Sequence, residues 1–245
     1  MIQGDLIINK WDYQVELFAR YFCAHARLPK DSKFTLLDVG CGTGSALRII
    51  KTEYPQSDLY GCDIEPEHIR ISEQLNGQYG KYFISDIENL KSYWDILYLS
   101  NVLEHLKDWR RMISQLLSNT NRLYILVPFR ERITFLPEDN SDHSYHLNSF
   151  DTESFSYLEN LDYLVEYRVI TTPYAWGSGP VRNLFYKYSV FGSPNEYRSE
   201  LLVCITRRNA LVTKPFHSRI KATNQIVFKT LIPIYFKKYV KSREL

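Results

Sequence analysis

Three alternating glycines follow an acid in a short segment of this chain: after Asp38 come Gly40, Gly42 and Gly44. A buried apolar run, residues 34–39, precedes them and a helical pattern follows. Glycine adopts positive φ angles and lets a ligand approach the backbone closely. Ligands in open α/β sheets bind at the carboxyl ends of the strands. We therefore expect this turn to contact a ligand, through Asp38, Gly40, Cys41, Gly42, Thr43 and Gly44.

The glycine spacing distinguishes between two kinds of nucleotide ligand. A dinucleotide site has the pattern G-x-G-x-x-G, in which the third glycine lets helix and strand pack closely. Counted from Gly40, that third position holds Ser45, so the NAD interpretation fits poorly. The carboxylate of Asp38 suits the ammonium group of a cofactor that carries an amino acid, whereas a pyrophosphate would gain nothing from it.

Further polar residues stand where the next strands are expected to end. Asp63 ends the second strand, and a carboxylate at that position can accept both ribose hydroxyls. Asp86 follows the third strand and can accept a hydrogen bond from an adenine amino group, with Ile64 and Ile87 packing on the faces of the ring. The fourth strand ends at the same edge with Ser100 and Asn101.

The segment Asp38–Gly44 resembles the first motif of class I S-adenosylmethionine-dependent methyltransferases. Asp63, Asp86 and residues 101–106 fall where that family places its later motifs. The resemblance covers residues 34–129 well, and the pair Glu104–His105 is similar to the small-molecule branch. It implies S-adenosyl-L-methionine as cofactor. The implied reaction is methyl transfer to an oxygen or nitrogen of a secondary metabolite, a sugar or glycan precursor, or a quinone-type lipid.

Four residues are candidates for catalysis. The resemblance places Glu104 and His105 beside the methionine end of the cofactor or beside the substrate. Alternatively, both have structural roles: Glu104 lies in the first turn of a helix, where its negative charge interacts favourably with the helix dipole, and His105 is partly buried. His143 and His146 follow the fifth strand, and either could act as a general base at neutral pH, unless both lie in a solvated loop.

The same residues raise the question of a metal. The small-RNA 3′-end methyltransferases place a Glu-His pair and a later loop histidine around a divalent ion. Glu104, His105 and either His143 or His146 are similar to that set. The acid that this branch uses one turn earlier is Asn101 here. Oxygen and imidazole ligands at loose spacing are weak evidence for an ion, so we expect no metal.

These residues need a framework of alternating strands and helices to bring them together. The hydrophobic pattern predicts strands at 34–39, 59–62, 82–84, 96–99, 123–127, 164–170 and 201–205. It predicts helices at 11–27, 46–51, 66–75, 104–117 and 152–159. Strands that alternate with helices through short connections form a parallel sheet covered on both faces.

The expected fold class is therefore α/β, a Rossmann-like doubly wound sheet, and the resemblance implies seven mostly parallel strands. We expect one methyltransferase domain over residues 1–207, with a helical cap at 1–30. Insertions at 130–150 and at the aromatic-rich segment 172–198 would line the substrate side, because long loops in compact domains are usually functional. Residues 208–245 form a basic tail, expected to pack on its own domain or on a second copy of the chain in a homodimer. Attraction of this tail to a membrane surface or an anionic partner is the alternative.

The length, net charge and cysteine content of the chain limit the classes of protein to which it can belong. The 245 residues suffice for one large α/β domain, and the four scattered cysteines read as reduced core residues. The N-terminus has no pattern of a secretory signal, and no stretch of the sequence is long and apolar enough to span a bilayer, so the chain is expected to be cytoplasmic. A net charge of +2 gives no strong attraction to nucleic acid, so a small-molecule acceptor is favoured. An RNA methyltransferase, or a non-catalytic scaffold that binds S-adenosylmethionine, remains the alternative.

Overall fold

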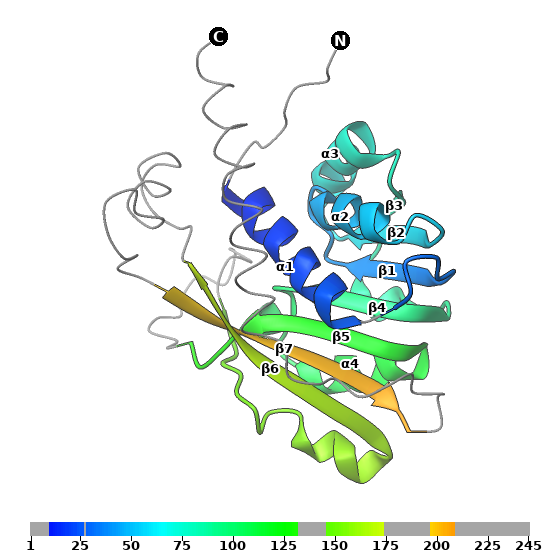
Figure 1. The fold of residues 1–245 in the computed structure, drawn as a ribbon. Helices are drawn as coiled ribbons and strands as arrows, with labels where there is room; N and C mark the ends of the chain where they lie inside the picture. The colour runs from blue at the N-terminus through cyan, green and yellow to red at the C-terminus, as the bar shows by residue number, and fades with distance from the viewer. Residues whose placement is uncertain (1–9, 27, 132–145, 174–196, 209–245) are drawn as a thin grey trace.

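The computed structural model describes residues 10–26, 28–131, 146–173 and 197–208. They form a seven-stranded sheet with the order β3-β2-β1-β4-β5-β7-β6 (Figure 1). The strands are β1 (Thr35–Val39), β2 (Asp58–Asp63), β3 (Lys81–Ile84), β4 (Trp94–Ser100), β5 (Thr120–Pro128), β6 (Tyr163–Pro173) and β7 (Tyr197–Arg207).

The sheet reverses its winding direction beside β1. This strand pairs in parallel with β2 on one side and with β4 on the other, so the strand order switches between β1 and β4. A ligand site in a doubly wound fold is expected at the carboxyl end of this switch point. β7 runs antiparallel between β5 and β6. The prediction of a Rossmann-like, mostly parallel seven-stranded sheet is confirmed.

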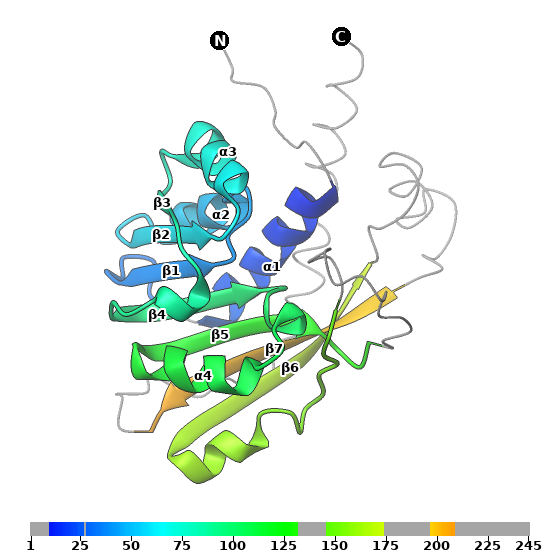
Figure 2. The same cartoon turned by 180° about the vertical axis from the view of Figure 1, so that it is seen from behind.

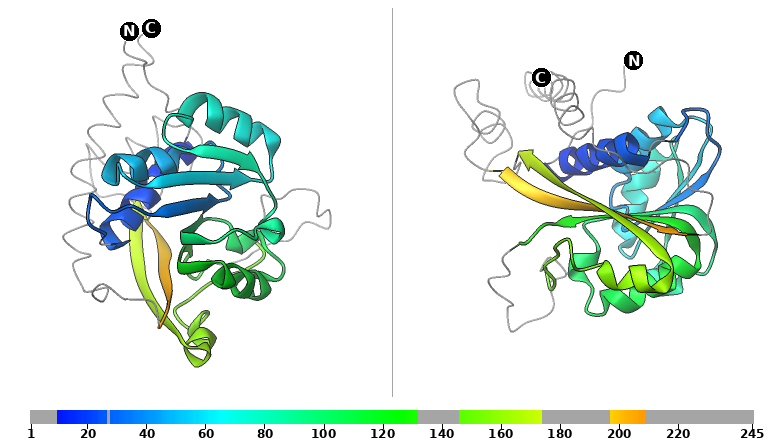
Figure 3. Two further views of the ribbon diagram at one scale, coloured as in Figure 1. Left: turned by 90° about the vertical axis from the view of Figure 1, so that its right-hand side faces the viewer. Right: turned by 60° about the horizontal axis from the view of Figure 1, so that its bottom comes forward.

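Helices cover both faces of the sheet. The helices α1 (Lys10–Ala26) and α4 (Trp109–Ser118) lie on opposite faces, as Figures 1 and 2 show from the two sides. The helices α2 (Ser45–Glu53) and α3 (Pro66–Asn76) complete the α1 side, where Leu36 and Tyr98 join them in one apolar core. Leu37 and Leu99 point to the other face and pack with α4. Alternate residues of each central strand thus contribute to two cores, one on each face of the sheet. Figure 3 shows the helices lying on the two faces.

One helix is shorter than its sequence pattern predicts. The apolar spacing predicts a helix from Glu104, but Leu103–His105 form a separate 3₁₀ turn, η2, and α4 begins at Trp109. The side chain of Asp108 accepts a hydrogen bond from the backbone N–H of Arg111 at 3.2 Å and so caps α4. An N-cap residue has non-helical backbone angles, which separates η2 from the helix.

The region after β5 also departs from the predicted elements. The helix expected at 152–159 is a 3₁₀ helix, η3 (Ser156–Leu161), which ends where Asp162 adopts a left-handed φ of 65°. β6 and β7 are longer than expected because they pair with each other along their whole length, from Tyr163–Arg207 to Pro173–Tyr197.

Two further features concern the cysteines and the lengths of the helices. None of the four cysteines forms a disulfide; Cys41, Cys62 and Cys204 are buried, as expected of core residues, whereas Cys23 is only partly buried. Among the described residues, no helix combines the length and the apolar character that crossing a bilayer requires.

Candidate functional site

The glycine turn lies at the carboxyl end of β1. Gly40, Gly42 and Gly44 all have positive φ, at 73°, 53° and 79°. A Cβ atom on Gly40 would lie 2.6 Å from Val102 Cγ2, so this position excludes a side chain. A Cβ on Gly42, in contrast, would meet no heavy atom of the described residues within 4 Å. The space beside the Gly42 backbone is therefore open to a ligand.

Two carboxylates flank this turn from adjacent strands. Asp38 and Asp63 are almost completely buried, with relative exposures of 2% and 8%. Burial, and after it the negative charge of Asp63, raises the pKa of the Asp38 carboxyl well above its ordinary value. Two buried carboxylates that lie close together repel each other, which lowers the stability of the protein when no ligand is bound. A cationic group bound beside them would relieve this cost, as the expected ammonium would.

Asp63 also organises the turn. One carboxylate oxygen accepts the N–H of Gly42 at 2.8 Å, and the other accepts the N–H of Glu65 at 3.0 Å. His68 Nδ1 lies 3.3 Å from this second oxygen. These bonds hold the carboxylate at the end of β2, where the sequence predicted a partner for ribose hydroxyls.

The glycine turn accepts hydrogen bonds from two residues that were not predicted from the sequence. The Asn76 amide donates to the carbonyl of Thr43 at 2.8 Å, and the Tyr82 hydroxyl donates to the carbonyl of Gly44 at 3.3 Å. Asn76 ends α3 and Tyr82 lies in β3, so both are distant from the turn in sequence. No local pattern predicts such contacts.

Apolar side chains stand beside Asp63 at the same edge. Ile64 and Ile84 are 59% and 58% exposed, which is unusual for isoleucine, and Ile84 pairs in register with Asp63. Ile87 is partly buried against the α4 side of the sheet. The sequence predicted Ile64 and Ile87 as adenine contacts but missed Ile84. The exposed isoleucines beside Asp63 offer apolar surface to the faces of a flat ring.

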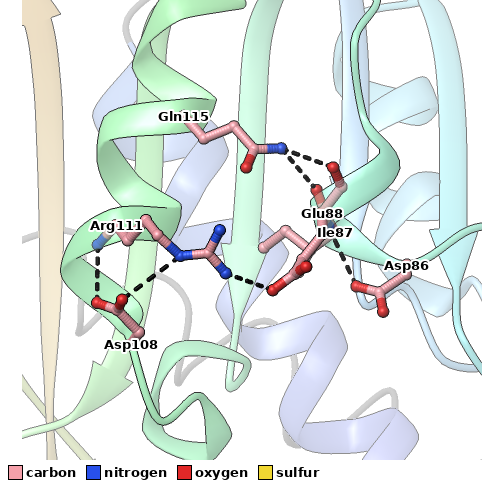
Figure 4. A network of polar contacts seen from close by, with 6 residues as sticks. All are labelled: Asp86, Ile87, Glu88, Asp108, Arg111 and Gln115. Atoms are coloured by element: carbon pink, nitrogen blue, oxygen red, sulfur yellow. Dashed lines mark hydrogen bonds and ion pairs between the residues drawn. The ribbon is translucent and has the colours of Figure 1, made fainter.

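A polar network fixes the loop that carries Asp86 (Figure 4). The Asp86 carboxylate accepts the N–H of Glu88 at 3.1 Å and caps the 3₁₀ turn η1 (Ile87–Asn89). Gln115 of α4 donates to the carbonyls of Glu88 and Ile87 at 2.9 and 3.5 Å. Arg111 binds the Glu88 carboxylate at 2.6 Å and the Asp108 carboxylate at 3.4 Å. The loop at the predicted adenine site is thus attached to α4.

The end of β4 completes this edge of the sheet. Asn101 follows Ser100 with a left-handed φ of 56°, and its N–H donates to the carbonyl of Leu126 at 2.9 Å. Its side-chain oxygen is buried and has no hydrogen-bond partner among the residues that the structure describes. A buried acceptor of this kind favours a ligand that can donate to it.

Three of the four catalytic candidates meet beyond β4. Glu104, fully buried, His105 and His146 each offer an oxygen or nitrogen atom, and these atoms lie within 4.8 Å of one another. The two imidazole rings are 4.8 Å apart at an interplanar angle of 81°. The group is compact enough for proton transfer and also for a shared cation. His143, the fourth candidate, lies outside the described residues.

Two further residues hold this group, and the sequence analysis missed both. The Glu131 carboxylate bonds to His146 Nδ1. The Asn148 amide donates to the carbonyl of Leu106 at 2.7 Å, beside η2. Glu131 could have been noticed as an acid in the same loop as two histidines, but nothing local predicts the contact of Asn148.

Comparison of the sequence with known proteins finds one family and one curated relative. A family model described as "Methyltransferase domain" matches residues 13–169, more than half of the chain. Trans-aconitate 2-methyltransferase of Azoarcus sp. (strain BH72) is 26% identical over 98 residues. That match covers 38% of this chain and 37% of the length of the relative.

Comparison of the fold finds similar solved structures. The plantazolicin methyltransferase BpumL, solved with SAH, superimposes with a TM-score of 0.52 at 20% identity, over 81% of this chain and 85% of that one. Magnesium protoporphyrin IX methyltransferase of Synechocystis PCC 6803, also solved with SAH, gives a TM-score of 0.54 at 18% identity, over 83% and 90%. Coclaurine N-methyltransferase gives 0.56 at 11% identity, over 82% and 74%. At these identities the likeness concerns the fold.

Proposed function

The chain belongs to the methyltransferase domain family, and on this premise we propose that it transfers the methyl group of S-adenosylmethionine to an oxygen or nitrogen of a small molecule. The observation that carries the proposal is the edge of the sheet at β1 and β2. There, positive-φ glycines, the accessible backbone of Gly42 and two buried carboxylates lie together. The family resemblance seen in the sequence is confirmed by the family match.

The residues at this edge fit the parts of the cofactor one by one. Asp38 would bind the ammonium group, Asp63 the ribose hydroxyls and Asp86 the adenine amino group, with Ile64 and Ile87 against the ring. The cofactor would supply an electrophilic methyl on a sulfonium sulfur. Two of the solved structures with similar folds were determined with bound SAH, which supports this assignment.

The chain itself must hold the acceptor in line with the methyl group, exclude water and accept a proton when the acceptor is a hydroxyl. His146 and His105 are the described candidates for that proton, with the buried Glu104 beside them. His143 remains a candidate from the sequence.

The similar proteins support a small acceptor. Their names refer to trans-aconitate, plantazolicin, magnesium protoporphyrin IX and coclaurine. The whole-chain charge of +2 gives no general attraction to RNA.

The test is transfer of an isotopically labelled methyl group from S-adenosylmethionine into a cell extract, followed by mass spectrometry of its metabolite and RNA fractions. We expect labelled small molecules with the native chain and none with Asp63→Ala. Label in the RNA fraction alone would contradict a small acceptor, and cofactor binding without transfer to any fraction would contradict an enzyme. His146→Ala with full activity would exclude His146 as the base.

A further inference from the structure

The segment that follows β5 is closed at its base. Phe129 and Phe150 form a β-bridge, and the N–H of Arg130 donates to the carbonyl of Phe150 at 2.7 Å. Residues on the two sides of this closure, Glu131 and His146, are therefore held near each other although fifteen positions separate them in sequence. Their contact depends on this closure at the base of the segment.

A second set of hydrogen bonds attaches residues 147–148, which follow His146, to η2. The N–H groups of Leu147 and Asn148 donate to the carbonyl of Glu104 at 2.6 and 3.1 Å. The Asn148 amide also lies within hydrogen-bond distance of the carbonyls of Leu103 and Leu106, at 3.3 and 2.7 Å. His146 precedes this attachment directly, so its backbone is fixed relative to Glu104 and His105.

The ring of His146 is fixed by a carboxylate. Glu131 bonds to Nδ1, and the side chains of His146 and Glu131 are 22% and 34% exposed. An ionised carboxylate only accepts hydrogen bonds, so Nδ1 must carry the proton. In a neutral imidazole the lone pair then lies on Nε2. His105 packs edge-on against the same ring.

From this geometry we propose that Glu131 is a positioning residue that makes Nε2 of His146 the proton acceptor of the reaction. The inference rests on the proposed methyl transfer to a hydroxyl. In that step an oxygen–carbon bond forms, the carbon–sulfur bond breaks with its electron pair going to sulfur, and the hydroxyl proton moves to Nε2. The resulting imidazolium lies beside the Glu131 carboxylate, which stabilises its charge.

The direct test is the tautomer of His146, measured by nitrogen-15 long-range correlation spectra of the histidine rings without cofactor or acceptor. The chain has six histidines, and the spectrum of His146→Gln identifies the resonance. We expect a protonated Nδ1 and an unprotonated Nε2 in the native chain. In Glu131→Leu, which removes the acceptor, we expect the proton to move to Nε2.

Matched variants separate this role from a merely structural one. Glu131→Asp should retain the native tautomer, and Glu159→Leu, at an exposed glutamate of η3, should leave it unchanged. With an acceptor identified by methyl labelling, Glu131→Leu should lower kcat by at least about tenfold with little change in KM.

Three results would overturn the assignment: a native ring protonated on Nε2, a tautomer insensitive to Glu131→Leu, or Nε2 ligated by a divalent cation that copurifies with the chain. The tautomer is measured without methyl transfer. A failure of the proposed function, seen as absence of labelled product, is therefore distinguishable from a failure of this inference.

Discussion

At the scale of a single residue, the buried carboxyl group of Asp38 lowers the stability of the folded protein when no ligand is bound. Its pKa is raised by burial and by the neighbouring Asp63. A group with a raised folded pKa stabilises the protein fully at pH below its unfolded pKa and loses this contribution as the pH rises through the folded pKa. The protein without ligand therefore becomes less stable as the pH rises above the ordinary pKa of an aspartate.

Asp38→Asn should remove this cost and the ligand contact together. We expect the variant without ligand to unfold at a higher temperature than the native chain, with the difference growing from about pH 5 to about pH 8. The variant should also bind S-adenosylhomocysteine more weakly, because it lacks the charge that faces the ammonium. Thermal unfolding and calorimetry measure the two effects. A variant that is less stable at every pH and binds normally would contradict this role.

At the residue scale, the sequence predicted acids at successive strand ends because strand ends can be read from local hydrophobic runs and glycines. Asp38, Asp63 and Asp86 indeed lie at the carboxyl edge, and their roles in binding stay predictions. Asn76 and Glu131 could not be found in this way. Asn76 contacts a residue far along the chain, which only the folded topology creates, and Glu131 stands out in the sequence only as an acid in the same loop as two histidines.

At the scale of elements, α4 controls the loop at the predicted adenine site. Arg111 forms its ion pairs at the surface, and exposed pairs contribute little. Gln115 instead satisfies two backbone carbonyls of η1 from a partly buried position. The amide of Gln115 is therefore the contact expected to matter for the position of Asp86.

Gln115→Ala should weaken S-adenosylhomocysteine binding about two- to tenfold, the scale of one or two hydrogen bonds. In an Asp86→Ala background the same change should have little effect, since the loop then has no carboxylate to present. Calorimetry on the four proteins of this double-mutant cycle gives the coupling. Gln56→Ala, at an exposed glutamine before β2, is the matched control. Additive effects of Gln115 and Asp86 would show that α4 does not act through this loop.

Helices and strands could be predicted where the hydrophobic spacing was regular, but the residues at which they begin and end could not. The alternation from β1 to β5 follows from short apolar runs and helical spacing. The predicted start of α4 at Glu104 was wrong, because the cap of Asp108 ends the irregular segment that carries η2. Glu104 and His105 are therefore held by η2 and Asn148 rather than by the first turn of a helix.

At the scale of the whole molecule, the described chain is expected to unfold as one unit. The family match ends at residue 169, yet β7 lies between β5 and β6. Leu202 of β7 is fully buried, pairs with Leu126 and belongs to the core that contains α1 and α2. The last described strand thus completes the core formed by the first helices.

Leu202→Ala should lower the free energy of unfolding by about 2–5 kcal/mol, as other buried leucine truncations do. Fluorescence and circular dichroism should still report one coincident transition. Leu161→Ala, at a leucine that is 57% exposed, should change stability by no more than about 0.5 kcal/mol. Two separate transitions in Leu202→Ala would show instead that β6 and β7 form a unit of their own.

The central claim, that the edge at β1 and β2 binds S-adenosylmethionine, is tested most directly by calorimetric titration with S-adenosylhomocysteine and with NAD. Asp58, exposed at the opposite end of β2 from Asp63, provides the control. We predict stoichiometric binding of S-adenosylhomocysteine to the native chain and to Asp58→Ala. Asp63→Ala should lose at least about 1–2 kcal/mol of binding free energy, and NAD should not bind. Tight binding of NAD alone, or unchanged affinity in Asp63→Ala, would contradict the account.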